Sequence, residues 1–467
     1  MRLPTALRPL RHPRFRTLAI SMCLSLASGG VLILALVWQV VALDGGPRQL
    51  SLVTAANGVG LVATALLGGV LADRVPQRRI LMTTELTKGI AIGVVAALSL
   101  AGHLQVWHLA VAALLAGILD GLYYPAYSAL VPALLPPDDL LAANGLEGMA
   151  RPVLFNAAGP ALAGAIVAAY SPGAALAISA VAALAAGAVL VFLPLTALRR
   201  DLGTDETHPL LAAARDLREG FAYLVRTPWL HATLAFASVM VLLVMGPFDV
   251  LLPFVIKDNA GGGPSEHALV LAAFGIGGAV GSLLVASRPM PRRYLTAMLL
   301  AWGIGCLPMA LMGFLSSVAV MVVIALIVGG AFQGATVIWG TLLQRRVPPE
   351  LLGRVSSLDF FVSLVFMPAS MALAGPAAEW FGLTAVFVVA GVAPTLLAVV
   401  AIVAARLPAD EIAHPLRSAE PEPEPEPESG SESESGSDGV SDAPSPDLGP
   451  PPTAPAPGPG ASGHVTP

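Results

Sequence analysis

The chain has 467 residues, of which 56% are hydrophobic and only 12% charged, and its formal net charge at pH 7 is −5. Because soluble domains carry about 25% charged residues, this composition excludes a soluble enzyme and a nucleic-acid-binding protein. The net charge does not indicate a partner, since an acidic C-terminal segment supplies much of the negative charge.

Long apolar runs predict membrane-spanning helices, because a helix needs about 20 apolar residues to cross the bilayer core. The first run follows several arginines, as in a signal peptide, but it is longer and no small-residue cleavage site follows it, so we expect an uncleaved span. Gly and Pro clusters separate most of the runs. We predict twelve spans, at residues 17–43, 49–72, 80–101, 106–131, 141–169, 174–196, 229–256, 267–287, 294–315, 318–343, 355–380 and 383–405.

The spans form two groups of six, which predicts an all-α membrane protein with two pseudo-symmetric six-helix halves. Apolar residues at helical spacing from Leu210 to Leu224 predict an amphipathic helix on the membrane surface. The C-terminal tail alternates Glu and Pro and then becomes rich in Ser, Gly and Pro, so we predict disorder. The predicted parts are a cytoplasmic N-terminal arm (1–16), a first bundle (17–196), a connector (197–228), a second bundle (229–405) and the cytoplasmic tail (406–467).

The placement of basic residues predicts the orientation in the membrane. If the N-terminus is cytoplasmic, 21 of the 25 Lys and Arg residues lie in cytoplasmic segments, two in outer loops, and two, Lys88 and Arg151, inside spans. Cytoplasmic loops of membrane proteins carry an excess of basic residues. We therefore predict a multi-pass protein of the cell membrane with both termini in the cytoplasm.

The two halves share a weak internal repeat. Residues 74–79 carry Arg at the first, fifth and sixth positions after the second span, and residues 288–293 do the same after the eighth. Gly159-Pro160 in the fifth span is matched by Gly375-Pro376 in the eleventh. Repeated halves with a binding site between them near the midplane are the architecture of secondary transporters.

Residues 69–79 read Gly-Val-Leu-Ala-Asp-Arg-Val-Pro-Gln-Arg-Arg, which resembles the loop signature of the major facilitator superfamily. Residues 124–132, 142–146 and 217–224 resemble one branch, the exporters related to the enterobactin exporter and macrolide efflux proteins. The resemblance extends over residues 11–406 and implies a twelve-helix transporter. It also implies that a gating loop holds the halves together in one state and releases them in the other; its residues are Gly69, Asp73, Arg74, Arg78 and Arg79.

Ionisable residues inside the spans are few, and such residues are costly and usually functional. Glu85 and Lys88 are three residues apart, and Glu147 and Arg151 are four apart, so each pair can form on one helix face. Asp120 lies in the middle of the fourth span with no charge nearby in sequence. We predict that Asp120 takes up and releases protons and that Arg151 changes the proton affinity of Asp120. The two pairs are either further coupling residues or contacts that hold helices together.

The fifth span contains a short motif that resembles the antiporter motif of drug exporters. Gly159, Pro160 and Gly164 match it, and Ala163 replaces one of its glycines. Pro bends a helix and small residues allow close packing, so we expect this segment to seal the cytoplasmic side.

Aromatic and amide side chains in several spans are candidates to line a cavity for a bulky apolar ligand, with packing as the alternative. Asp249 and Asp359 lie nearer to the ends of their spans and are interpreted as structural. The candidate cavity residues are Trp38, Gln39, Tyr123, Tyr124, Tyr127, Gln333 and Phe360.

Together with the resemblance, these features predict a proton-coupled secondary transporter that exports small lipophilic or amphipathic molecules, such as drugs or antibiotics, by alternating access. A siderophore or other natural-product exporter is the alternative among transporters, and a non-transporting membrane scaffold or sensor that acts through the acidic tail is the alternative of another class. No Walker A loop, metal-ligand cluster or nucleophile triad is found in the sequence. We therefore expect no enzyme activity, nucleotide, cofactor or metal; the expected partners are a small-molecule substrate, protons and lipid.

Overall fold

The computed structural model describes residues 5–194 and 221–416. Residues Met1–Ser418 form one compact unit, which contains every described element. The predicted connector helix lies mostly outside the described residues. Within the described elements the backbone alone is described at 5–7, 65–70, 72–74, 137–138, 141, 144–145, 349–350, 352–354, 356–358, 360 and 362–364.

Every described element is a helix, and many helices begin at a Pro, which fits the first turn because it has no N–H to satisfy. The first half comprises η1 (Thr5–Arg11), α1 (Pro13–Ala42), α2 (Pro47–Arg74), α3 (Gln77–Leu100), α4 (Val106–Leu134), α5 (Pro137–Ala150), η2 (Arg151–Ala158), α6 (Gly159–Ala169), α7 (Pro172–Val189) and η3 (Leu190–Phe192). The second half comprises α9 (Pro228–Gly246), η4 (Pro247–Leu251), α10 (Leu252–Asp258), α11 (Pro264–Ala286), α12 (Tyr294–Cys306), η5 (Leu307–Phe314), α13 (Val318–Arg346), α14 (Pro349–Phe381), α15 (Leu383–Ala404) and α16 (Leu407–Ala413).

Ten continuous helical segments among the described residues are long and apolar enough to span a membrane, and they coincide with ten of the predicted spans. The other two predicted spans, 49–72 and 355–380, fall within α2 and α14, which have 28 and 33 residues. The chain is thus a multi-pass membrane protein whose described elements are all helical, and the count of twelve spans stays a prediction. We call the helix ends that carry the arginine pairs 78–79 and 345–346 the basic end, and the other ends the opposite end.

The first part of the predicted tail is ordered, so the prediction of disorder from residue 406 is wrong for α16. Leu407 is fully buried, and Glu411 accepts hydrogen bonds from the backbone N–H and hydroxyl of Thr296 at 2.7 and 2.9 Å. These bonds satisfy free donors at the start of α12. Arg346, at the end of α13, forms an ion pair with Asp410 at 2.5 Å. Buried carboxylate contacts, which the composition of the tail does not reveal, therefore fix this helix.

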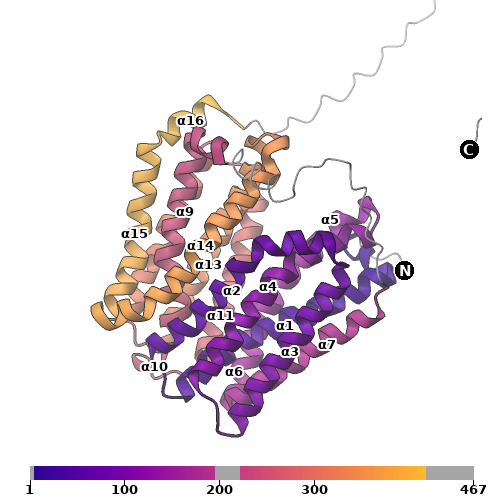
Figure 1. Ribbon diagram of the computed structural model, residues 1–467. Coiled ribbons are helices and arrows are strands. Elements are labelled where there is room, and N and C mark those ends of the chain that lie inside the picture. The colour runs from indigo at the N-terminus through magenta and orange to yellow at the C-terminus, as the bar shows by residue number, and fades with distance from the viewer. Residues whose placement is uncertain (1–4, 195–220, 417–467) are drawn as a thin grey trace, which may run out of the picture. The chain divides into compact units, whose positions relative to one another are not determined.

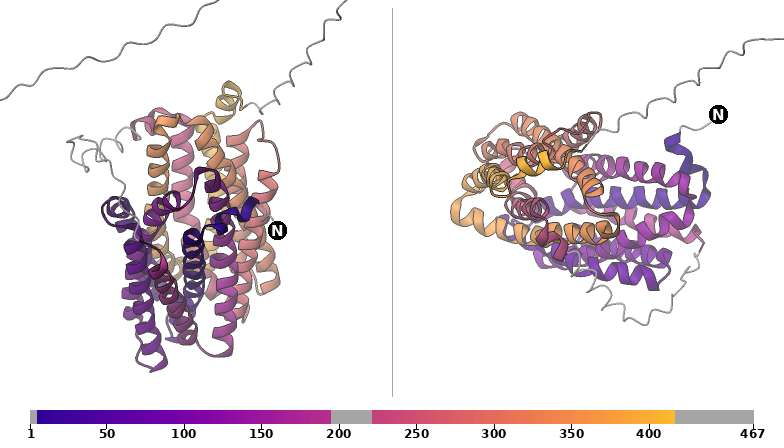
Figure 2. Two further views of the ribbon diagram at one scale, coloured as in Figure 1. Left: turned by 90° about the vertical axis from the view of Figure 1, so that its right-hand side faces the viewer. Right: turned by 90° about the horizontal axis from the view of Figure 1, so that it is seen from above.

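The same pair of helices packs most closely in each half (Figures 1 and 2): α2 against α4, and α11 against α13. A Cβ atom at Gly117 of α4 would lie 1.9 Å from the backbone oxygen of Asn57 on α2. A Cβ atom at Gly329 of α13 would lie 2.1 Å from the backbone oxygen of Phe274 on α11. Only glycine permits such close backbone contact. These are the second and fourth spans of each half, so the packing follows the internal repeat of the sequence.

Contacts between the two halves gather toward the opposite end of the helices. The backbone N–H of Gly375, near the end of α14, donates to the Ser51 hydroxyl at the start of α2 at 2.7 Å. A Cβ atom at Gly164 of α6 would lie 2.7 Å from the Cβ atom of Ala268 in the first turns of α11. The helices of the two halves therefore meet at the end that lies away from the arginine pairs.

Candidate functional site

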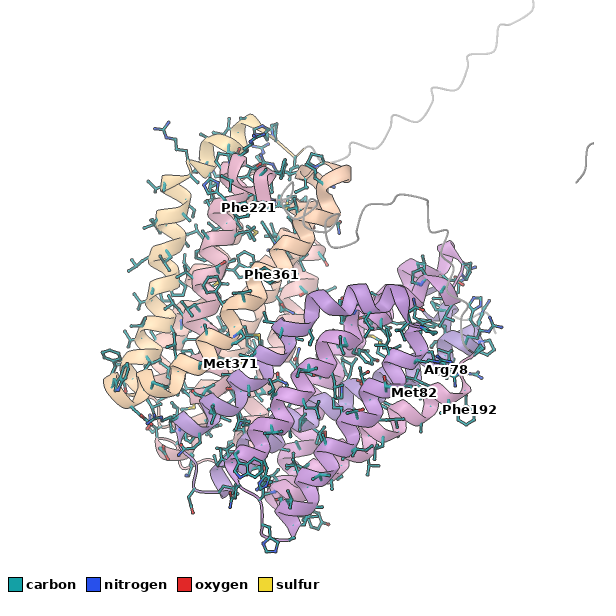
Figure 3. The ribbon with its side chains drawn as sticks, in the orientation of Figure 1. Arg78, Met82, Phe192, Phe221, Phe361 and Met371 are labelled. Carbon is teal, nitrogen blue, oxygen red and sulfur yellow. The ribbon has the colours of Figure 1, made fainter. Side chains whose placement is uncertain are left out.

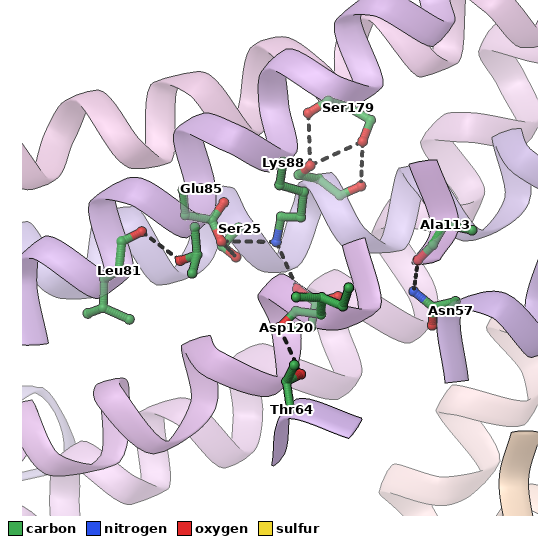
Figure 4. Close-up of polar contacts among 12 residues, drawn as sticks. Ser25, Asn57, Thr64, Leu81, Glu85, Lys88, Ala113, Asp120 and Ser179 are labelled. Carbon is green, nitrogen blue, oxygen red and sulfur yellow. Dashed lines mark hydrogen bonds and ion pairs between the residues drawn. The ribbon is translucent and has the colours of Figure 1, made fainter. Parts of the chain in front are cut away.

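Three ionisable side chains from α3 and α4 meet inside the first half (Figure 4). Lys88 Nζ lies 3.0 Å from Glu85 Oε1 and 3.1 Å from Asp120 Oδ1, so one ammonium group bridges two carboxylates. The Ser25 hydroxyl of α1 donates to the same Glu85 oxygen at 2.8 Å. We call Glu85, Lys88 and Asp120 the Lys88 cluster. It carries a net charge of −1 when both carboxylates are ionised.

Asp120 is the accessible member of this cluster. Glu85 is completely buried and the Lys88 side chain is 7% exposed, whereas the Asp120 side chain is 47% exposed. Asp120 lies near the middle of α4, where contact of a carboxylate with lipid would cost roughly 3 kcal/mol. We therefore expect the exposed face of Asp120 to meet water rather than lipid.

Arg151 does not contact Asp120. Its guanidinium lies 3.4 Å from Glu147, four residues earlier, and 5.6 Å from the ring centre of Tyr124. Lys88 is thus the cation in contact with Asp120, in place of the Arg151 that the sequence suggested. The rotation of the helices about their axes explains this difference. The spacing within α3 places Lys88 beside Glu85, and the packing of α3 on α4 determines which face of α4 Lys88 meets.

The three tyrosines of α4 divide between the interior and the accessible face. The rings of Tyr123 and Tyr127 are nearly parallel with centres 6.2 Å apart, and Tyr127 donates to the sulfur of Met22. The Tyr123 hydroxyl and Glu85 Oε2 are buried without a hydrogen-bond partner among the described residues. Tyr124 is 47% exposed, and because it follows Asp120 by four residues the two share a helix face. Tyr124 is therefore the tyrosine best placed to meet a ligand.

Trp38 and Gln39 are buried between helices and do not line an open cavity. Trp38 Nε1 donates to Nδ1 of His267 on α11 at 3.3 Å, which is a contact between the two halves. The Ser99 hydroxyl of α3 donates to Gln39 Oε1 at 2.7 Å. His267 was not predicted as a site residue; its position three residues after Pro264, directly before an apolar run, was the available signal.

The remaining cavity candidates lie in the second half. The Gln333 side chain packs against α11, where a Cβ atom at Gly278 would lie 2.8 Å from Gln333 Cγ. The Phe360 side chain lies outside the described residues, and Figure 3 places the neighbouring Phe361 on α14. A packing role therefore accounts for Gln333.

In the gating loop, Arg78 makes its contacts within the first half (Figure 3). Its guanidinium donates to the backbone oxygens of Leu190 and Val191 at 2.9 and 2.8 Å, which satisfies carbonyls at the end of the sixth span. Arg79 is exposed. The side chains of the other three gating candidates, Gly69, Asp73 and Arg74, lie outside the described ones.

The antiporter-like motif is a packing surface. A Cβ atom at Gly159 would lie 2.7 Å from the Cα atom of Gly30 on α1, and Pro160 is buried beside it. Gly164 contacts Ala268 of the other half. Close packing was predicted, but the contact of Gly164 is at the opposite end and not at the arginine-rich side where the seal was expected. The direction of the fifth span explains this, because α6 ends at the opposite end.

Replacing Trp38 with Phe should weaken the closure of the halves at the opposite end, since it removes the donor to His267. The loss of one hydrogen bond, about 1 kcal/mol, should raise the open population about fivefold. This can be measured as the labelling rate of a Ser51→Cys reporter by a membrane-impermeant thiol reagent, in a chain without Cys23 and Cys306. Trp107→Phe, at an exposed Trp, is the control; equal labelling in both variants would contradict the prediction.

Known proteins resemble this chain over most of its length. The family described as transmembrane secretion effector matches residues 4–441. The multidrug efflux pump Tap of Mycolicibacterium fortuitum is 28% identical over 393 residues, which cover 82% of this chain and 93% of that protein. Macrolide efflux protein A of Streptococcus pyogenes is 24% identical over 401 residues, which cover 84% of this chain and 95% of that protein.

Solved structures agree on the fold. The nucleoside transporter NupG superposes with a TM-score of 0.67 at 13% identity and covers 83% of this chain and 98% of its own. A bacterial homolog of the human lysosomal transporter Spinster, in an inward-facing and unoccupied conformation, has a TM-score of 0.62 at 16% identity and covers 88% and 99%. The chain is thus a transporter that belongs to the transmembrane secretion effector family, within the major facilitator superfamily.

Proposed function

We propose that this transporter exports small lipophilic or amphipathic molecules in exchange for protons, by alternating access across the cell membrane. The half-exposed Asp120, in contact with the buried Lys88, is the observation that carries the proposal. The relatives named as multidrug and macrolide efflux proteins support the export of drug-like molecules.

In this proposal Asp120 exchanges a proton with the space between the halves. Protonation removes its charge and ends its ion pair with Lys88, which keeps Glu85 as a partner at 3.0 Å. Lys88 is therefore never left as an unpaired buried cation, whose cost would be several kcal/mol. The neutral Asp120 side chain and the neighbouring Tyr124 then present a less charged surface, which suits an apolar ligand.

The basic residues indicate which side of the membrane each end of the helices faces. The excess of arginine at the basic end supports a cytoplasmic location for that end and for both termini. The contacts of Ser51 with Gly375 and of Gly164 with Ala268 then close the outer side. The conformation is accordingly proposed to be open to the cytoplasm, where an exporter loads its substrate.

Asp120→Asn is expected to lower protonophore-sensitive efflux by a factor of about 5 to 150, the range for coupling free energies of about 1–3 kcal/mol. The amide keeps the size of the side chain and cannot take up a proton. The measurement is efflux of a panel of antibiotics and dyes from a pump-deficient bacterial strain, with and without a protonophore. Asp258→Asn, at an exposed helix end, should pump as the unmodified chain does. Unchanged efflux by Asp120→Asn would move the coupling to another residue, and efflux that ignores the protonophore would reject proton exchange.

A further inference from the structure

The seventh predicted span is interrupted in its middle by a side chain from another helix. The Ser370 hydroxyl of α14 donates to the backbone oxygen of Leu242 at 2.6 Å and accepts the backbone N–H of Gly246 at 2.7 Å. In a regular helix Gly246 would donate directly to Leu242, so Ser370 is inserted between the two groups. Pro247 follows and has no N–H, and η4 continues as a π-helix.

Asp249 lies on this interruption. Nine residues separate it from the end of α10 at Asp258, which at about 1.5 Å per residue is roughly 14 Å. This depth is close to the middle of a bilayer core about 30 Å thick, deeper than the sequence suggested. Its neighbours Phe248 and Val250 are 7% and 0% exposed. Asp249 itself is partly buried and makes no hydrogen bond or ion pair with the described residues.

Among the side chains that the structure describes, no opposite charge on the surrounding elements compensates Asp249. The segment η4 packs against α2, α9, α10, α14 and α15, and the ring of Phe248 lies 4.9 Å from that of Phe274 on α11. The ionisable residues with described side chains lie toward the ends of these elements, except Asp359, which accepts a hydrogen bond from Trp339. They are Arg48, His231, Lys257, Asp258, Glu266, His267, Asp359 and Glu379.

The position of η4 relates the Asp249 carboxylate to the proposed movement of the two halves between inward-open and outward-open states. The helix α2 belongs to the first half, so its contact with η4 crosses between the halves. A lone carboxylate at this depth has to be neutralised, and interruptions of membrane helices near the midplane are where transporters place ion sites. A proton is the ligand that needs no further coordinating groups.

We propose that Asp249 is a second proton-binding residue, in the second half, and that Ser370 positions it. The inference rests on the proposed exchange with protons. The Asp249 carboxylate takes up one proton to become a neutral carboxyl and returns it when the halves move, and no other bond forms or breaks. Asp120, bridged by Lys88, and Asp249, which contacts no cation among the described side chains, then form two sites on opposite halves of the transporter.

Infrared difference spectroscopy between low and high pH on the full-length protein in lipid vesicles tests the proposal. Protonated carboxyl groups give a C=O stretching band in the difference spectrum. In Asp249→Asn this band should be smaller by the contribution of one carboxyl group. Asp359→Asn, the matched control, should remove a different contribution or none. Ser370→Ala restores the direct bond between Leu242 and Gly246, so the Asp249 band should remain but change the pH of its midpoint.

The outcomes separate this proposal from the general one. A carboxyl signal that is the same in Asp249→Asn and the unmodified chain overturns the assignment of Asp249, and an unchanged midpoint in Ser370→Ala overturns the positioning role. Protonophore-sensitive efflux should also fall about tenfold in Asp249→Asn. If the unmodified chain pumps without regard to the protonophore, proton exchange itself is rejected, whatever the infrared result.

Discussion

Replacing Lys88 with Met is expected to abolish transport and to destabilise the first half strongly. Lys88 is the cation of both Glu85, which is fully buried, and Asp120. Removing one partner of a buried ion pair costs about 3–5 kcal/mol, because it leaves a charge uncompensated. We expect a marked fall in the thermal unfolding temperature, measured on the purified protein in detergent, and loss of efflux.

Two further variants test whether the expected loss of stability comes from the buried charge of Lys88. Arg151→Met breaks a pair in which the Arg side chain is 48% exposed, and such pairs contribute about 0–1 kcal/mol, so its unfolding temperature should change little. Glu85→Gln combined with Lys88→Met removes both buried charges and should recover much of the stability but not the transport. Equal stability of Lys88→Met and Arg151→Met would contradict the bridging role of Lys88.

Gly117→Ala is expected to give the largest loss of folded protein among single methyl additions. The new Cβ atom would lie 1.9 Å from the Asn57 backbone oxygen, and backbone cannot move aside as a flexible side chain can. The helices α2 and α4 would have to separate, and overpacking of this kind costs about 1–3 kcal/mol or more. The same reasoning predicts a comparable loss for Gly329→Ala in the matching pair of the second half.

Gly340→Ala is the control for these variants, because a Cβ atom at Gly340 would meet no atom within 4 Å. Ala is a better helix former than Gly by about 1 kcal/mol, so this change should be neutral or slightly stabilising. The readout is the amount and melting temperature of monodisperse protein by fluorescence-detected size exclusion. Gly117→Ala that behaves like Gly340→Ala would show that α2 and α4 are less closely packed than described.

These two predictions concern different requirements of an alternating-access transporter. The glycine contacts bring the helices of each half close together, which favours movement of each half as one body. In the proposed mechanism, Asp120 of the Lys88 cluster and Asp249 are the groups whose charge changes as the halves move. The proposed exchange of a proton for a substrate needs both closely packed halves and titratable groups within them.

Features that depend on neighbours along the chain could be predicted from the order of the amino acids. Apolar runs located the helices to within a few residues, because span length is set by bilayer thickness. The pairs Glu85–Lys88 and Glu147–Arg151 form as expected, since helical spacing alone places residues three or four apart side by side. The repeated arginine and Gly-Pro patterns likewise indicated two related halves.

The three-dimensional structure was needed to find which groups meet across helices. It placed Lys88 instead of Arg151 beside Asp120, inserted Ser370 into the helix that carries Asp249, and paired Trp38 with His267. Each of these contacts depends on the rotation and depth of two helices relative to each other. Apolar periodicity does not specify rotation in helices that are hydrophobic on nearly all sides, because lipid and protein interior are equally apolar surroundings.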